Sequence, residues 1–357
     1  MPRLSGLQPQ DGCAVRYIIW NVYITMRKIP LNLLTLYADL LQNVGLDEIP
    51  EGSITIRTVK TIKYVYLTEK VTRRQINLGR ADNPDVMERA EVIRHKTEAS
   101  KSLRATVTAL KNAKIPAPSL PLGRVLQAIA SAGLFNRGII LVGTAAYQTY
   151  SCILGYYLPG SAIMTNDADL LAASFVAGED ALDLEEILQR ADPTFKAQMS
   201  RNDTLPKVFR ASNAFQVDVL TRYGRGRTSP VPIKGLGCAA EALTFMEYLA
   251  EDPIDAVALY GTGVPVKVPR PLRYAIHKLL IAQERSGRHV PKKAKDLLQA
   301  KDIIGAYQDD NPEELEDELA AARNRGRAWK KNINASLNEI GLTERQQRQA
   351  PSTQRKR

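Results

Sequence analysis

The segment Thr165-Asn-Asp-Ala-Asp-Leu-Leu171 carries two carboxylates two residues apart, followed by an apolar run. In an extended chain, residues i and i+2 point to the same face, so a strand here would place Asp167 and Asp169 side by side. The leucines that follow would bury this strand and hold the pair rigid. Because two like charges this close are unfavourable unless a cation neutralises them, the segment predicts a cation site on a buried strand.

A second strand is predicted further along the chain, at Phe215-Gln-Val-Asp-Val-Leu220. Its phenylalanine and two valines lie on one face, which leaves Asp218 on the other face with Gln216. A charge within an apolar run needs a partner, and a cation shared with the first two carboxylates would provide one. Two other interpretations remain open, a surface hairpin with Asp218 in solvent and an ion pair between Asp218 and Arg210.

A strand and a turn precede both carboxylate segments. Gly138-Ile-Ile-Leu-Val142 predicts a short buried strand, and Gly143-Thr144 opens a predicted helix from Ala145 to Leu154. A helix N-terminus presents unpaired backbone N–H groups and a positive dipole end, so this turn is a candidate phosphate cradle. A Gly-Thr pair is also typical of an ordinary tight turn.

Taken in order, these elements resemble the polymerase-β-like nucleotidyltransferase superfamily. Four strings are more specific: LVGTAAYQTY at 141–150, TNDADLL at 165–171, VPRPLRYAIHKLLIA at 268–282 and KKAKDLLQAKDII at 292–304. They resemble bacterial nucleotidyltransferase-fold proteins that are distant kin of abortive-infection and toxin-type nucleotidyltransferases. The similarity extends from about residue 30 to residue 342. One departure is the long separation of Gly143 from Asp167, which the segment 155–164 must accommodate.

The resemblance implies roles for individual residues. Asp167, Asp169 and Asp218 would be the catalytic carboxylates and would hold Mg²⁺ or Mn²⁺, and Gly143 with Thr144 would hold the NTP phosphates. Lys278 would contact the triphosphate, and we expect it to lie off the apolar stripe of its helix with its ammonium free to reach the cleft. Asp296 is a weaker candidate for the nucleotide site. A solvated helix lysine is the other interpretation of Lys278.

The stretch between residues 53 and 80 is rich in β-branched residues and tyrosine at a spacing of two, which predicts a small β-sheet. Seven basic side chains in it face one acid, Glu69, and two tyrosines lie among them: Arg57, Lys60, Lys63, Lys70, Arg73, Arg74, Arg80, Tyr64 and Tyr66. Such a surface can hold phosphates and stack bases. A solvated sheet face with the tyrosines packed underneath is equally compatible.

The remaining signals concern the helices and the chain ends. Asn83-Pro84 predicts the capped start of a charged helix that runs to about Leu110, and the proline-rich segment 115–121 predicts a linker. The acidic and then basic stretch 311–338 predicts one helix whose charges match its dipole. Residues 345–357 predict disorder, and the change of composition at Met26 suggests that a chain beginning there would fold and work like the whole.

Composition limits the function. The chain has 357 residues, a net charge of +11 and three cysteines without a CxxC pair, so a disulfide framework and a zinc site are both disfavoured. The positive charge favours polyanionic partners. No 18-residue apolar run or secretory signal is evident, so we expect no membrane partner and a cytoplasmic location.

These observations predict an α+β protein with a nucleotidyltransferase-fold mixed sheet, a small N-terminal β module and a helical C-terminal unit. Residues 1–25 are expected to be a mis-assigned or disordered start, and residues 26–117 an N-terminal helix with the basic β module and helical arm. Residues 118–235 are expected to form the catalytic core, 236–342 a mostly helical unit and 343–357 a disordered basic tail. The expected reaction transfers NMP from an NTP to an acceptor hydroxyl. RNA is the favoured acceptor, while a protein or a small molecule such as an aminoglycoside stays open. The alternative is a nucleic-acid-binding protein with a degenerate transferase core.

Overall fold

The computed structural model describes residues 15–19, 22–45, 51–70, 73–162, 165–173, 175–178, 181–199, 204–223, 229–285, 287 and 290–342. The tail at 343–357 and residues 1–14 of the predicted start lie outside these residues. In the described part of the predicted start, β1 (Val15–Ile19) pairs antiparallel with β2 (Val22–Met26). The helices of the described chain are each too short or too polar to span a lipid bilayer.

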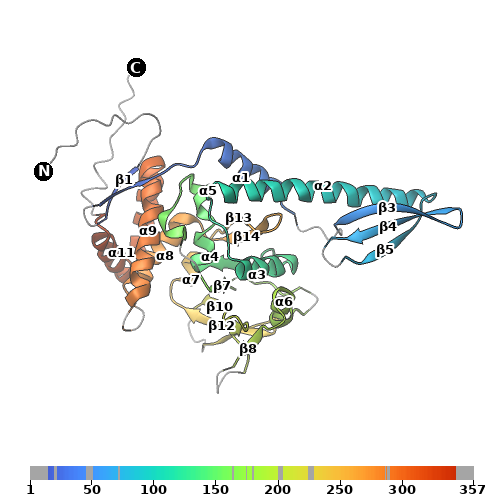
Figure 1. Ribbon diagram of the computed structural model, residues 1–357. Coiled ribbons are helices and arrows are strands. Elements are labelled where there is room, and N and C mark those ends of the chain that lie inside the picture. The colour runs from blue at the N-terminus through green and yellow to red at the C-terminus, as the bar shows by residue number, and fades with distance from the viewer. Residues whose placement is uncertain are drawn as a thin grey trace, which may run out of the picture.

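The N-terminal part of the chain forms a helix, a three-stranded antiparallel sheet and a long helix: α1 (Leu31–Asn43), β3 (Gly52–Val59), β4 (Ile62–Glu69), β5 (Gln75–Arg80) and α2 (Pro84–Asn112). The predicted cap is present, because the Asn83 side chain accepts a hydrogen bond from the backbone N–H of Asp85. Figure 1 shows the sheet packed under one end of α2, which extends away from the rest of the molecule. This part therefore forms an arm that carries a small sheet.

A mixed sheet forms the centre of the molecule, with strand order β11-β12-β10-β7-β6 and with β8 and β9 attached beside β10. The strands are β6 (Ile140–Val142), β7 (Asp167–Leu171), β8 (Lys196–Gln198), β9 (Val208–Arg210), β10 (Gln216–Arg222), β11 (Val231–Ile233) and β12 (Cys238–Leu243). β10 runs parallel to both β7 and β12, whereas β6 is antiparallel to β7. The predicted α+β class with a mixed sheet is confirmed.

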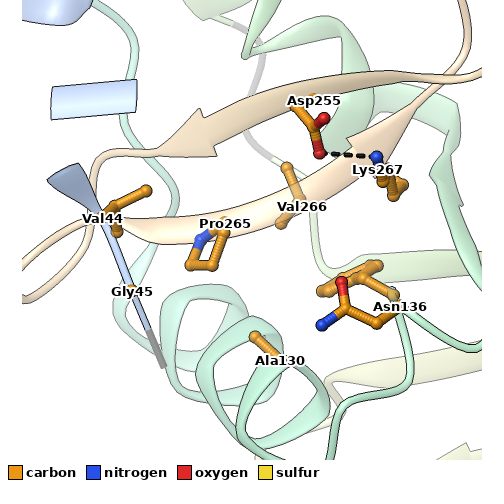
Figure 2. Close-up of a pocket in the computed structure, with 9 residues that line it drawn as sticks. Val44, Gly45, Ala130, Asn136, Asp255, Pro265, Val266 and Lys267 are labelled. Atoms are coloured by element: carbon orange, nitrogen blue, oxygen red, sulfur yellow. Dashed lines mark ion pairs between the residues drawn. The ribbon is translucent and has the colours of Figure 1, made fainter. Parts of the chain in front are cut away.

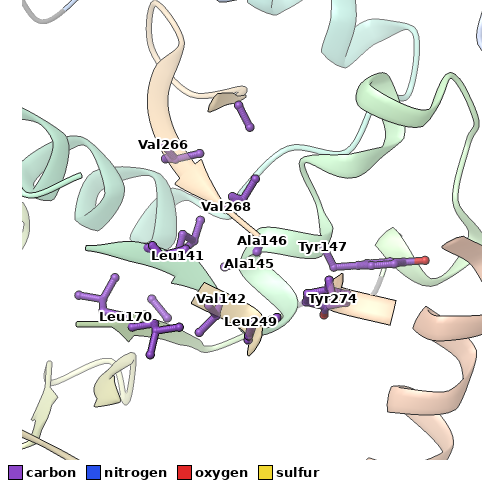
Figure 3. Packing of buried hydrophobic residues seen from close by; sticks show 14 of the residues in the cluster. Leu141, Val142, Ala145, Ala146, Tyr147, Leu170, Leu249, Val266, Val268 and Tyr274 are labelled. Atoms are coloured by element: carbon purple, nitrogen blue, oxygen red, sulfur yellow. The ribbon is translucent and has the colours of Figure 1, made fainter. Parts of the chain in front are cut away.

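Helices and a hairpin cover this sheet. The hairpin joins β13 (Ile254–Ala258) to β14 (Val264–Val268), and α3 (Leu120–Ser131) packs against both β14 and α6 (Leu184–Ala191). Figure 3 shows apolar side chains of β14 facing those of β6 and the following short helix, with Val266 and Val268 opposite Leu141 and Ala146. The apolar core therefore lies directly behind the strand ends that carry the carboxylates.

The C-terminal part is helical and begins beside the sheet: α7 (Met246–Ala250), α8 (Pro271–Ala282), α9 (Val290–Asp310), α10 (Pro312–Asn324) and α11 (Arg327–Glu339). Helix α8 packs against α9 and α11. β12 falls in the part of the chain that we expected to be mostly helical, and its pairing with β10 extends the central sheet past residue 235.

Two helix predictions are wrong in their extent. The segment 311–338 forms two helices, α10 and α11, because the chain leaves the helical conformation at Gly326 (φ 156°). The segment after Gly143 also forms two short helices, α4 (Gly143–Tyr147) and α5 (Tyr150–Leu154), before the 3₁₀ turn η1 (Pro159–Ala162). In each case the continuous helical pattern hid a break, since local propensity does not decide how successive turns pack.

Candidate active site

Parallel pairing brings the two carboxylate strands together. In the register of β7 and β10, Asp218 lies opposite Asp169, and Gln216 lies opposite Asp167. The intervening side chains, Ala168 on β7 and those of Val217 and Val219 on β10, are buried on the other face. The period of two along each strand therefore sends all three carboxylates to one face of the sheet.

These carboxylates line a cavity of about 420 Å³ between the sheet and α8. Its lining joins the strand ends to residues of α7, α8 and the first turn of α9: Val142, Gly143, Asp167, Asp169, Asp218, Leu220, Leu243, Thr244, Met246, Leu249, Tyr274, His277, Lys278, Ile281, Glu284, Arg285 and Lys292. Acidic groups thus face basic groups across the cavity, and apolar side chains form part of its wall. Such a combination is typical of a small-ligand site.

Gly143 closes the cavity beside Asp169. It follows Val142, which pairs with Asp169 across β6 and β7, and its φ is +65°, in the left-handed region that glycine adopts without strain. A β-carbon at this position would lie 2.1 Å from Oδ2 of Asp169. The other residue of the predicted phosphate cradle, Thr144, is buried and is not among the residues that line the cavity.

The carboxylates perturb one another. The pKa of Asp169 is raised to about 6, first by burial and then by the nearby charges of Asp167 and Asp218, with Lys278 and Lys292 acting in the opposite direction. The pKa of Asp218 is also raised, chiefly by burial, and a hydrogen bond from Gln216 opposes this effect. A site in which three carboxylates lie together and burial raises the pKa of two of them, Asp169 and Asp218, favours a bound cation, because a cation restores the balance of charge.

Polar neighbours hold two of the carboxylates. The Thr165 hydroxyl donates to Oδ1 of Asp167, and the Gln216 amide nitrogen lies 2.8 and 2.9 Å from the two oxygens of Asp218. Arg210 donates to Oε1 of Gln216, at 2.5 Å, and so reaches Asp218 only through this amide. Among the described residues, no three Asp, Glu, His or Cys side chains adopt the arrangement of a metal-binding group.

Lys278 does not have the free ammonium that we expected. Its side chain is buried, with 7% of the residue exposed, and its Nζ lies 2.6 Å from Oδ1 of Asp296. Nε of Arg285 lies 3.1 Å from the other oxygen of Asp296. The expectation failed because α9 packs along α8 and brings Asp296 to the cavity side of the helix. Asp296 is not among the residues that line the cavity, and it contacts the site through these two cations.

Tyr274 ties α8 to the glycine turn. Its hydroxyl lies 3.0 Å from the carbonyl oxygen of Gly143 and 2.9 Å from Oε1 of Gln299. Its ring stacks on Tyr147 with 5.9 Å between the ring centroids, as Figure 3 shows beside Ala145 and Ala146. Nζ of Lys278 lies 5.2 Å from the centroid of the same ring. Tyr274 therefore fixes both the turn and the lysine that face the cavity.

The cavity residues that were not identified as site residues from the sequence include Tyr274, His277, Arg285 and Lys292. The sequence holds a signal for Tyr274 and Arg285. Positions 274, 278, 281 and 285 recur at a spacing of three or four, so a helix through them would place these two residues on the same face as Lys278. His277 is buried, neither of its ring nitrogens has a hydrogen-bond partner, and burial lowers its pKa to about 3. It is therefore neutral at physiological pH.

A second cavity of about 250 Å³ lies between the end of α1, α3 and β14. Figure 2 shows its lining, in which Asp255 and Lys267 form an ion pair at 2.7 Å beside Pro265, Val266 and Ala130. The paired charges neutralise each other. The second cavity therefore lacks the concentration of acids and opposing cations that distinguishes the carboxylate cavity.

Comparison with known proteins identifies the family of the chain. A family model described as a nucleotidyltransferase matches residues 121–324, which is more than half of the chain and includes every strand and helix that lines this cavity. No curated protein and no solved structure matches the chain. An enzyme of this class takes a nucleoside triphosphate as substrate and transfers its nucleotidyl group, and the chain belongs to this nucleotidyltransferase family.

Proposed function

We propose that the protein transfers NMP from an NTP to an acceptor hydroxyl in a metal-dependent reaction at Asp167, Asp169 and Asp218. The observation that carries this proposal is the parallel register that sets Asp169 beside Asp218 on the face where Asp167 also lies. A likeness to the polymerase-β-like superfamily and to bacterial toxin-type nucleotidyltransferases belongs to the same proposal. It rests on the order of the glycine turn and the three carboxylates along the chain.

The donor set fits Mg²⁺ or Mn²⁺. These ions prefer oxygen ligands, and the three acids that repel one another in one cavity supply such ligands with excess negative charge. Asp167, Asp169 and Asp218 would hold the ions, with Asp218 using the oxygen lone pairs to which the Gln216 amide does not donate. When bound, the ions polarise the reacting phosphate and stabilise the charge on the attacking and departing oxygens.

The side chains of the cavity have separate tasks in this reaction. Lys278, Arg285 and Lys292 face the triphosphate end, where positive charge stabilises the departing pyrophosphate. Asp218 is suited to take the proton of the acceptor hydroxyl at a carboxylate oxygen, because its raised pKa makes it a stronger base than an ordinary aspartate. The apolar wall that includes Met246 would exclude water beside the nucleoside.

The acceptor we favour is RNA. The support is the net charge of +11 and the basic, tyrosine-containing sheet of the N-terminal arm. A protein side chain or a small molecule such as an aminoglycoside is the competing acceptor class. The proposed chemistry is the same for each acceptor class, since each presents a hydroxyl for in-line attack on the phosphate.

The decisive test is labelling with each α-³²P-labelled NTP. The purified protein is incubated with a cell extract and Mg²⁺ or Mn²⁺, and the products are separated into RNA, protein and small molecules. Asp169→Asn should abolish labelling, whereas Asp255→Asn, which removes a carboxylate outside this cavity, should leave it unchanged. The acceptor fraction that carries the label identifies the substrate class, and full labelling by Asp169→Asn would refute the proposed site.

A second candidate function is nucleic-acid binding by a degenerate transferase core. The observation in its favour is that no three Asp, Glu, His or Cys side chains of the described residues form a metal-binding group, while the Gln216 amide donates to both oxygens of Asp218. The two functions predict different outcomes with the same preparation. Tight RNA binding without labelling from any NTP, in either metal, would support the degenerate core.

A further inference from the structure

The β3–β5 sheet has an inner and an outer face. Register pairs Ile54 with Leu67 and Ile56 with Val65, and the buried side chains of Val65 and Leu67 lie on the inner face, toward α2. A β-carbon on Gly79, opposite Val65, would lie 2.8 Å from Val86 of α2. This contact identifies the inner face independently. The side chains that alternate with these must point outward.

The outer face gathers aromatic and basic side chains in adjacent pairs. Arg57 lies opposite Tyr64, and Tyr64 lies opposite Arg80 on the next strand. Tyr66 shares this face, with the guanidinium carbon of Arg57 5.7 Å from its ring centroid. The tyrosines are therefore not packed underneath the sheet, which removes one interpretation of the sequence. Both tyrosines are half-buried, while Arg57 and Arg80 are exposed.

The charge around this face is one-sided. Between residues 51 and 82 the chain has seven Lys or Arg and three Asp or Glu. Ion pairs join Arg80 to Asp82 and Lys70 to Glu51. A tight turn at Lys60 and Thr61 holds both residues at positive φ, 46° and 71°, and projects an exposed lysine from the end of the sheet. The surplus is positive and attracts a polyanion.

The arm carries this sheet to one side of the central mixed sheet (Figure 1). Helix α2 has 29 residues, which corresponds to a length of about 40 Å, and the sheet and its start contact this helix at Val86, Thr97 and Arg104. Figure 1 shows the sheet projecting to one side of the molecule, beyond the helices that surround the central sheet. A long flexible ligand could contact the arm and still reach the core, whereas a mononucleotide could not contact both.

We propose that the outer face of the β3–β5 sheet binds single-stranded RNA. Unpaired bases stack on Tyr64 and Tyr66, and the phosphates contact Arg57 and the lysine of the turn. Thr55, opposite Tyr66, and Asn77 beside it carry the hydroxyl and amide groups that can contact a ribose 2′-hydroxyl. The inference deepens the function proposed above, since it assigns a binding face to the RNA acceptor, but binding itself requires neither NTP nor metal.

Fluorescence anisotropy with a 5′-labelled 15-nucleotide RNA, without NTP or metal, tests the face directly. The variant Tyr64→Ala/Tyr66→Ala should bind at least about 25-fold more weakly, with about five-fold or more for each stacked base, whereas Tyr64→Phe/Tyr66→Phe should bind within about two-fold of wild type. Arg57→Gln should lower the slope of log affinity against log salt by about 0.7. The control Lys330→Gln/Lys331→Gln removes two exposed charges on α11 and should leave affinity unchanged within about two-fold.

A second variant covers the case in which the alanine protein does not fold. Thr55→Glu places a negative charge at an exposed position of the outer face and should also weaken binding by at least about ten-fold. Equal binding by Thr55→Glu and wild type would overturn the proposal, as would equal affinity for double-stranded RNA or for single-stranded DNA of the same sequence. Asp169→Asn should bind RNA like the wild type, so an inactive catalytic site does not affect this result.

Discussion

The backbone of Gly143 and the carboxylate of Asp169 occupy adjoining space, since a β-carbon on residue 143 would lie 2.1 Å from Oδ2 of Asp169 and 3.1 Å from its Cγ. The hydroxyl of Tyr274 holds the carbonyl oxygen of Gly143 from the other side, at 3.0 Å. The glycine is thus fixed between the sheet and α8. Its lack of a side chain decides where the central carboxylate can lie.

Gly143→Ala should therefore displace Asp169 and reduce transfer by at least about a hundred-fold. The added methyl meets the carboxylate, and the positive φ of 65° adds roughly 1–2 kcal/mol of backbone strain. Steady-state kinetics and chemical denaturation measure the two effects. Gly261→Ala is the matched control, because its φ is 61° and nothing lies within 4 Å of the added methyl. Equal activity loss in both variants would attribute the effect to backbone strain alone.

Asp169→Asn should make the metal-free protein more stable at pH 7.5. A carboxyl whose pKa is about 6 in the folded chain and about 3.8 in the unfolded chain lowers stability as pH rises through this window, because the folded state binds the proton more tightly. The loss of stability that the Asp169 carboxyl causes is absent below about pH 4 and complete above about pH 7. The gain in the free energy of unfolding should approach about 3 kcal/mol at pH 7.5 and vanish near pH 4.

Urea denaturation in EDTA at several pH values measures this gain. Added Mg²⁺ should stabilise the wild type at pH 7.5 and should stabilise Asp169→Asn much less, since the variant lacks one proposed ligand. A destabilised Asp169→Asn in EDTA would show instead that this carboxylate is held in a structural ion pair.

Lys278→Ala should lower both stability and turnover, whereas Lys292→Ala should lower NTP affinity without affecting stability. Lys278 is buried against Asp296, so its removal leaves this carboxylate with Arg285 alone and should cost about 3 kcal/mol of folding free energy. Lys292 also lines the cavity but is exposed. Denaturation and titration with a non-hydrolysable NTP separate the two roles. The double variant Lys278→Ala/Asp296→Ala should be more stable than Lys278→Ala alone. If the stability losses of Lys278→Ala and Asp296→Ala simply added in the double variant, that result would contradict an ion pair between Lys278 and Asp296.

Gln216→Ala should move the acid limb of the kcat/KM profile to higher pH. Its amide donates to the Asp218 carboxylate and favours the charged form, so its removal should raise the pKa of Asp218 further. Because the reaction needs the deprotonated carboxylate, activity would then be lost at a higher pH than in the wild type. Gln198→Ala, on the exposed strand β8, is the control. An unchanged limb in Gln216→Ala would exclude Asp218 as the group that titrates.

Much of the fold could be read from the sequence because its signals are local. The period of two around Asp167 and Asp218 predicted both strands and the face of each carboxylate, and the family of the chain followed from the order of these segments. Asn83 before Pro84 marked the start of α2. Two helices were predicted as continuous where the chain breaks, since a helical pattern does not reveal how its turns pack.

The sequence by itself determined which residues could form the site: the Asp-x-Asp pair, the strand aspartate, the glycine turn and a helix with lysine. Only the tertiary structure decided their partners. Lys278 lies against Asp296, Asp218 accepts from Gln216, and Gly143 is held by Tyr274. Two of these contacts join different helices or turns, and the third depends on the side-chain rotamer of a strand neighbour. Neither kind is encoded in local periodicity, because both arise from packing and desolvation when the elements come together.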